Sequence, residues 1–159
     1  MEDFLNKLNL FYFLTICTSQ HSGGLTAPNL LATIPGLLTT MEAEKIWHVR
    51  TATIMPDHLH LLVALGESSE LSSSIRFFKG RLAPALRLAG IRWERGYFDH
   101  RVRSEEDRLP IFLYIFLNPY KKNLQAIGES WRGYFCAKND WAWFGPLTDI
   151  ACPFPEWLQ

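Results

Sequence analysis

The 159-residue chain has no net charge, no paired-cysteine motif and no long hydrophobic run. Its 16 Lys and Arg are balanced by 16 Asp and Glu, so total charge alone does not indicate a polyanionic partner. The longest apolar runs, 11–17 and 59–65, fall well short of the roughly 20 residues that a membrane span requires. The chain opens with Glu2 and Asp3 instead of the basic segment that starts a signal peptide. We therefore expect a cytoplasmic protein with no membrane contact.

The three cysteines, Cys17, Cys136 and Cys152, are scattered and form no CxxC pair. An odd number cannot pair completely within one chain, so we expect free thiols. Any metal site would then depend on histidines. The hydrophobic content of 48% argues against disorder, and the length suits one domain with a single core.

The basic residues are concentrated in one part of the chain although the total charge is zero. Between Arg76 and Arg103 there are eight basic and two acidic residues, which leaves the rest of the chain acidic. Such polarity fits a basic surface for a polyanion on an acidic body. A solvated helix face gives similar counts, so charge alone leaves both interpretations open.

The spacing of apolar residues predicts seven elements. Aromatic and β-branched residues or strict alternation predict strands over 10–19, 45–55, 55–63 and 91–103, and helical spacing predicts helices over 28–44, 70–90 and 108–124. We expect Pro35 and Pro84 to disturb their helices. After about Leu124 the pattern weakens, and we expect an irregular, aromatic tail packed on the body.

The βαββαβ order of these elements is typical of a split-βαβ, ferredoxin-like sandwich. We therefore predict an α+β fold with an antiparallel sheet and helices on one face, followed by a C-terminal helix over 108–124. We divide the chain into a domain over 1–124 and an aromatic, Pro-containing extension over 125–159 on the same domain.

The stretch "MPDHLHLLV", Met55 to Val63, places two histidines on an otherwise apolar strand. Because strand side chains alternate, His58 and His60 point to the same face. Two neutral imidazoles side by side are a common way to hold a divalent metal, with Asp57 as a possible acceptor behind them. The alternative is that each ring is a half-buried, hydrogen-bonded histidine.

The predicted helix "RLPIFLYIFLNPYKKNL" carries three polar side chains on one face. Tyr114, Asn118 and Lys121 follow each other at i, i+4 and i+7. A tyrosine can act as a covalent nucleophile when a metal or basic group lowers the cost of ionising it. Alternatively, Tyr114 lies at the core boundary, and Asn118 before Pro119 caps a new helical segment.

The blocks "MPDHLHLL", "WERGYFDHRVRSEED" and "YIFLNPYKKNL" together resemble the successive signatures of the REP-associated tyrosine transposases. These proteins belong to the single-tyrosine HUH transposase superfamily, which includes insertion-sequence transposases. The resemblance spans most of the chain from Tyr12 to Leu124. The segment "YKKNL", the neutral total charge and the tail after Leu124 depart from the family pattern.

The resemblance implies a metal-dependent endonuclease and strand transferase that cuts single-stranded DNA at hairpins or palindromes. His58, His60 and Asn118 would hold Mg²⁺ or Mn²⁺, and Tyr114 would be the nucleophile that forms a 5′-phosphotyrosine link. The family includes monomers and homodimers, and the sequence does not decide between them. The basic band would then bind DNA, and we name as DNA-binding residues Lys79, Arg81, Trp93, Arg101, Arg103, Lys121 and Lys122. Each of these could instead be surface, or core in the case of Trp93.

Three other functions stay open from the sequence. A catalytically silent, domesticated nucleic-acid-binding protein would keep the same fold, although both histidines, Tyr114 and Asn118 are retained. A nucleotide hydrolase of the histidine-triad type would need a third histidine where this chain has Leu62. A small-molecule metal hydrolase would release phosphate from nucleotides without any DNA adduct.

Overall fold

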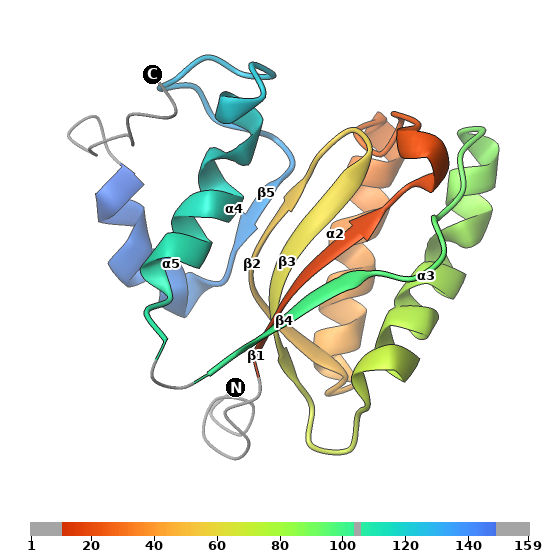
Figure 1. The fold of residues 1–159 in the computed structure, drawn as a ribbon, viewed down its shortest axis with the longest axis horizontal. Coiled ribbons are helices and arrows are strands. Elements are labelled where there is room, and N and C mark those ends of the chain that lie inside the picture. Colours follow the sequence, from red (N-terminus) through yellow and green to blue (C-terminus); the bar gives the residue numbers. More distant parts are fainter. Residues whose placement is uncertain (1–10, 104–105, 149–159) are drawn as a thin grey trace.

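The fold is built on a five-stranded antiparallel sheet in the order β4-β1-β3-β2-β5 (Figure 1). The structure is a computed structural model, and it describes residues 11–103 and 106–148. Along the chain the elements are β1 (Phe11–Cys17), η1 (Ser19–His21), α2 (Pro28–Ala43), β2 (Trp47–Ile54), β3 (His58–Leu65), α3 (Leu71–Leu88), β4 (Phe98–Val102), α4 (Leu109–Lys121), β5 (Tyr134–Cys136), α5 (Lys138–Phe144) and η2 (Gly145–Thr148).

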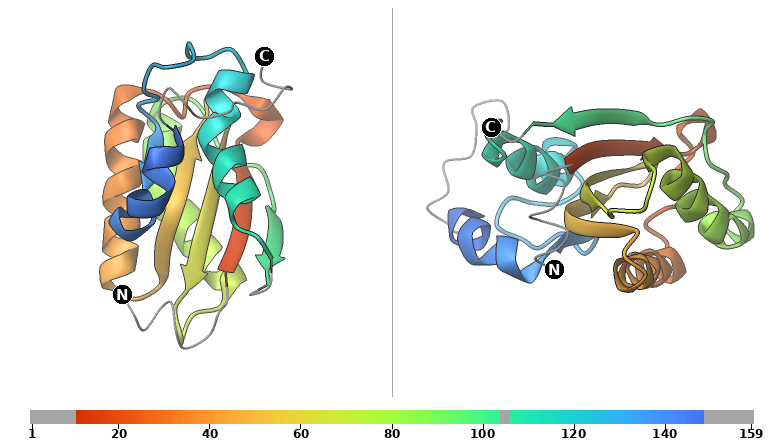
Figure 2. Two further views of the ribbon diagram at one scale, coloured as in Figure 1. Left: turned by 90° about the vertical axis from the view of Figure 1, so that its left-hand side faces the viewer. Right: turned by 90° about the horizontal axis from the view of Figure 1, so that it is seen from below.

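The sheet lies between two helical layers, with α2 and α3 on one face and α4 and α5 on the other (Figures 1 and 2). The mixed α+β class and the order of the first seven elements are confirmed, and β4-β1-β3-β2 is the strand order of a ferredoxin-like sheet. The predicted tyrosine-bearing helix, α4, packs against β2 and β3 from the face opposite α2 and α3.

The sequence of strand β3 explains why the sheet is covered by helices on both faces. Leu59, Leu61 and Val63 point into the core shared with α2 and α3, whereas Leu62 and Ala64 point into the core shared with α4. A central strand covered on both faces is almost continuously apolar, as this one is. The two histidines replace apolar residues on the α4 face only, so the same alternation that builds the core also selects the face of the site.

Three prolines lie inside continuous helices, because the burial of neighbouring apolar side chains outweighs the free-energy cost of a proline in a helix. Pro35 lies within α2, Pro84 within α3 and Pro119 within α4. A proline in a helix interior costs about 3 kcal/mol. In α2 the neighbouring Ile34 and Leu37 are buried, and each fully buried side chain returns about 1.5–3 kcal/mol. The helices that we expected Pro35 and Pro84 to disturb continue through both positions.

Two stretches differ from the sequence-based expectation. The predicted strand over 91–103 is reduced to Phe98–Val102, and residues 91–97 form an irregular segment in which Trp93 makes an isolated bridge with Thr18. The segment after Leu124 contains β5, which extends the sheet beside β2, and the short helix α5. Both elements are too short to give a periodic sequence signal, so an irregular tail was the wrong expectation for 134–144.

Cys17 and Cys136 are free thiols, and Cys152 lies outside the described residues. Among the helices that the structure describes, none combines the length and the apolar character needed to span a bilayer.

Candidate active site

The two histidine rings of β3 meet on the face covered by α4. Their Nε2 atoms lie 3.1 Å apart, and the ring centroids are separated by 4.6 Å. His60 is buried, whereas the His58 side chain keeps 17% of its surface exposed. The pair therefore has one ring held inside the protein and one at the rim.

A separate hydrogen-bond partner orients each ring from behind. The Nδ1 of His58 lies 2.7 Å from Asp57 Oδ1, and the Nδ1 of His60 lies 3.0 Å from Thr15 Oγ1. An ionised carboxylate only accepts hydrogen bonds, so Nδ1 of His58 carries the proton and its Nε2 has the free lone pair. Asp57 is in turn positioned by Thr18, whose backbone N–H and hydroxyl both donate to the Asp57 carbonyl.

The environment of His60 keeps its ring neutral. Burial, together with the neighbouring His58 and the positive charge of Lys122, lowers the pKa of His60 to about 3. A neutral imidazole can offer a lone pair to a metal ion, which a protonated ring cannot. The His60 ring is therefore neutral across the physiological range, as a metal ligand must be.

The structure brings Tyr114 against the histidines, from the facing helix. Its ring contacts His60 with a centroid distance of 5.2 Å and an interplanar angle of 70°. Phe13 of β1 stacks on His60 and meets Tyr114 edge-on, so it packs against both side chains. Tyr114 remains 40% exposed. Its ring is held in place while the phenol is open to an incoming substrate.

Asn118 lies one helical turn beyond Tyr114, on the same face of α4. Its side chain is 3% exposed, and its Oδ1 is buried without a hydrogen-bond partner. Lys122, a further four residues along, is close enough to lower the pKa of His60. Tyr114 and Lys122 thus bracket Asn118 on the side of the helix that faces the histidines.

The donor set fits a divalent ion. An unpaired buried carbonyl oxygen costs about 1–3 kcal/mol, so such an atom requires an explanation. Among the described residues no group of three His, Cys, Asp or Glu side chains gathers to hold a metal. Two imidazoles and the Asn118 oxygen would supply mixed nitrogen and oxygen ligands, which suit a divalent ion such as Mn²⁺.

Three of the predicted DNA-binding residues lie on or against α3. The Lys79 ammonium donates to the carbonyls of Glu94 and Gly96, and it thereby ties α3 to the irregular segment. Trp93 is half-buried on the core shared with α2 and α3, and its Nε1 donates to the Lys79 carbonyl. Arg81 is exposed, with its guanidinium over the Phe77 ring. Lys79 and Trp93 thus have structural contacts, and the role in DNA binding stays a prediction for all three.

The other four basic residues divide between β4 and the end of α4. Arg101 pairs with Tyr12 in the β1–β4 register, so it lies on the α3 face of the sheet, away from the histidines. Arg103 follows β4 and is exposed. Lys121 ends α4, and Lys122 is exposed beside it. Of the seven predicted DNA-binding residues, Lys122 carries a charge that contributes to the lowered pKa of His60.

Sequence reasoning missed Thr15 and Phe13, which both contact His60. Both are on β1, opposite His60 and Leu62 in the β1–β3 register. The alternation of β1 could have placed them on one face. The pairing register itself depends on tertiary structure, which the sequence pattern does not reveal.

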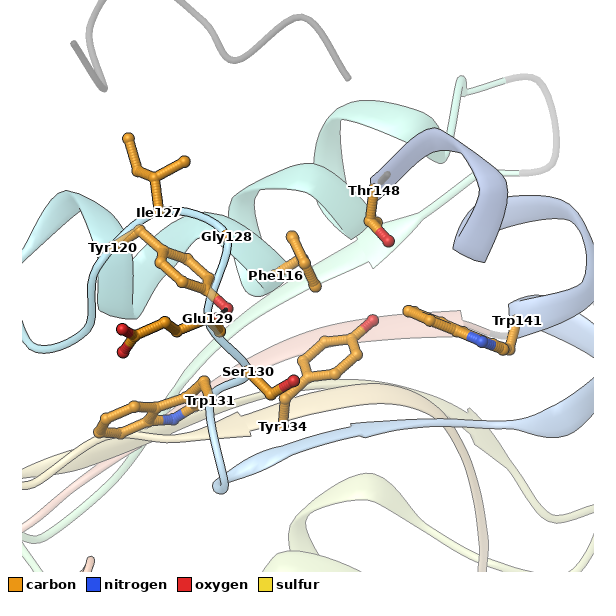
Figure 3. A pocket seen from close by; sticks show the side chains of 10 residues that line it. All are labelled: Phe116, Tyr120, Ile127, Gly128, Glu129, Ser130, Trp131, Tyr134, Trp141 and Thr148. Carbon is orange, nitrogen blue, oxygen red and sulfur yellow. Dashed lines mark hydrogen bonds between the residues drawn. The ribbon is translucent and has the colours of Figure 1, made fainter. Parts of the chain in front are cut away.

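A separate aromatic pocket of about 660 Å³ lies behind α4, between α4, β5 and α5 (Figure 3). Phe116 and Tyr120 line it from α4, and Trp131, Tyr134 and Trp141 line it from the tail. The Tyr120 hydroxyl donates to the Glu129 carbonyl, which holds the 124–133 loop against the helix. None of the predicted site residues lines this pocket, so it is distinct from the histidine site.

Comparison with known proteins places the chain among the IS200-like transposases. The family model for IS200-like transposases matches residues 7–115. This match covers more than half of the chain and includes both histidines and Tyr114. The chain therefore belongs to this family.

Individual relatives point in the same direction. A Haemophilus influenzae protein that carries the name REP-associated tyrosine transposase is 28% identical over 93 residues, which cover 49% of this chain and 52% of that protein. The chain thus spans about half the length of this curated relative.

Two solved structures share the fold. A REP-associated tyrosine transposase bound to a REP hairpin superposes with a TM-score of 0.66 at 20% identity, over 79% of this chain and 76% of the other. A protein of Deinococcus radiodurans described as a transposase gives a TM-score of 0.50 at 22% identity, over 67% of this chain and 88% of the other.

Proposed function

We propose that the protein is a metal-dependent endonuclease and strand transferase that cuts single-stranded DNA through a 5′-phosphotyrosine intermediate. The observation that carries this proposal is the packing of Tyr114 against His60, with the buried Asn118 oxygen on the same helix face. Family membership supports the reaction class, and the site supplies a nucleophile and a set of metal ligands.

His58, His60 and Asn118 would hold the Mg²⁺ or Mn²⁺ ion. When bound, such an ion polarises the scissile phosphate and stabilises the charge that develops on it. Asp57 and Thr15 keep the two imidazoles in the required orientation. The burial of His60 excludes water from the inner side of the site.

Tyr114 performs the covalent step. Its oxygen forms a bond to phosphorus while the bond from phosphorus to the 3′ oxygen breaks, which is an in-line exchange of one ester for another. The phenol proton leaves to solvent, to which the exposed side of Tyr114 is open, and the departing 3′ oxygen takes up a proton. Because one phosphodiester replaces another, attack by a second 3′-hydroxyl reverses the step and rejoins DNA without external energy.

We propose hairpin or palindromic single-stranded DNA as the substrate. The related transposase of known structure is bound to a REP hairpin, which supports the same kind of ligand here. Lys122 adds positive charge beside the site for the phosphate backbone. The genomic flanks of the gene identify the test substrate, since short palindromes repeated there are the expected targets.

The test is a cleavage assay on such hairpins with Mn²⁺ or Mg²⁺. Wild-type protein should form a denaturant-resistant adduct with the 5′ end of the DNA. Tyr114→Phe should reduce adduct formation by at least about 10³-fold, because the covalent nucleophile is lost. Tyr12→Phe, a tyrosine on the opposite face of β1, is the matched control and should leave the adduct unchanged.

Two results would overturn this proposal, each in favour of a different function. Tight hairpin binding without an adduct under any metal condition would identify a catalytically silent nucleic-acid-binding protein of the same fold. Metal-dependent release of phosphate from nucleotides, again without an adduct, would identify a small-molecule hydrolase.

A further inference from the structure

Phe98 of β4 is aligned with the candidate site across the sheet. In the antiparallel registers Phe98 is directly opposite Thr15, and Thr15 is directly opposite His60. Residues directly opposite each other point to the same face of the sheet. The three side chains therefore form one row, on the side from which Tyr114 approaches.

The Phe98 side chain is the most exposed of the three, ahead of the partly buried Thr15. It is 68% exposed, whereas His60 at the other end of the row is 5% exposed. Helix α4 packs against β2 and β3, the inner strands of the sheet on this face. Strand β4 is the edge of the sheet, so the exposed Phe98 ring lies at the open edge of the face that carries the histidines, a position that we call the shelf.

Position distinguishes Phe98 from other exposed apolar side chains. Single exposed apolar residues are common and need no explanation, and Leu88 at the end of α3, 87% exposed, is one of them. Phe98 is two strands from His60, roughly 10 Å at the usual strand spacing. A group on the shelf would thus be a neighbour of whatever bonds to Tyr114, without being the reacting group itself.

The exposed aromatic ring of Phe98 is better suited to contact a DNA base than a phosphate. The aromatic face offers no hydrogen-bond donor to a phosphate. The next side chain on the same face is His100, whose Nε2 lies 3.0 Å from the Glu106 carboxylate. Aromatic rings on single-strand-binding proteins stack on unpaired bases with little sequence preference.

We propose that Phe98 is a stacking platform for the unpaired base next to the scissile phosphate, so that it aligns the single strand for attack by Tyr114. This inference rests on the proposed function, because it takes single-stranded DNA as the substrate. It adds a DNA-binding residue that is neither basic nor part of the catalytic group.

The experiment measures affinity without cleavage, in the Tyr114→Phe background. Fluorescence anisotropy of a hairpin oligonucleotide with a single-stranded flank gives the dissociation constant. Phe98→Ala should weaken binding about 5- to 100-fold, and Phe98→Trp should restore it. Leu88→Ala is the matched control and should bind like the parent. Thermal melting of each variant checks folding, which should be unaffected at so exposed a position.

An abasic scan of the flank identifies the contact. One abasic position near the cleavage point should weaken binding to the parent protein and cause no further loss with Phe98→Ala. Equal losses in both proteins at every position, or unchanged affinity of Phe98→Ala, would refute the stacking role and leave the proposed function intact. Failure of the parent itself to bind any hairpin or single strand would refute both.

Discussion

The hydroxyl of Thr15 on β1 lies 3.0 Å from Nδ1 of His60 on the neighbouring strand. The other nitrogen of His60 faces His58, which donates its own Nδ1–H to Asp57. The metal-free pair therefore has His60 donating from Nε2, with its Nδ1 accepting from the Thr15 hydroxyl. Metal binding requires the other tautomer, in which Nδ1–H donates to Thr15 instead. A hydroxyl can serve both states because it donates and accepts.

Thr15→Val should therefore weaken metal binding without removing a ligand. Valine keeps the shape of threonine but can neither donate nor accept, and loss of such a supporting contact typically costs about 10- to 100-fold in metal affinity. Titration of the protein with Mn²⁺ by calorimetry measures the change. Thr39→Val, on the exposed side of α2, is the control. Equal Mn²⁺ affinity of the Thr15 variant and wild type would show that His60 needs no such support.

Asn118→Leu should separate stability from metal binding. The buried Oδ1 has no partner, so replacing the amide by an apolar side chain of similar size should change the free energy of unfolding without metal by no more than about 1 kcal/mol. Mn²⁺ should raise the melting temperature of wild type, because a ligand that binds only the folded state stabilises it. The variant should lose this rise. A strongly destabilised variant in EDTA would show that Asn118 has a structural role instead.

Asp140→Ala should be strongly destabilising. Asp140 on α5 accepts two hydrogen bonds from the buried Arg50 of β2, at 2.5 and 3.0 Å. Removing the carboxylate leaves a buried guanidinium uncompensated, at a cost of about 3–5 kcal/mol. Urea denaturation measures the loss. The double variant Arg50→Met/Asp140→Leu should recover most of the stability, and failure to recover would mean that the effect comes from packing of α5.

Cys136 should react slowly with thiol reagents in the folded protein. Burial is the main cause that raises the pKa of its thiol to about 11, against a weaker lowering by its hydrogen bond with Tyr134. At pH 8 roughly one thiol in a thousand would then be ionised. In a Cys152→Ser variant, both remaining thiols should react slowly with Ellman's reagent at pH 8 and rapidly in guanidinium, since the pKa of Cys17 is also raised by burial. Rapid reaction of one folded-state thiol would contradict this expectation.

The sequence was sufficient to predict the site residues where one local pattern determines the face on which a side chain lies. The alternation around His58 and His60 indicated their common face, and the four-residue spacing indicated that of Tyr114 and Asn118. Contacts that depend on strand register, such as that of Thr15 with His60, could be identified only from the folded structure. The elements β5 and α5 were missed because three and seven residues carry too little periodicity, and their positions depend on β2 and on the buried Arg50.

The helix that carries Tyr114 is fixed from two sides. Phe112 and Ile115 anchor α4 to the sheet, and Phe144 of α5 packs against both Phe112 and Phe116 from behind. Because α4 is packed on both sides, movement of its backbone can displace Tyr114 only a little. In the proposed reaction, displacement of a DNA end attached to Tyr114 would have to come from rotation of the side chain itself or from the DNA. The segment 138–144 would thus limit how far the proposed covalent intermediate can move.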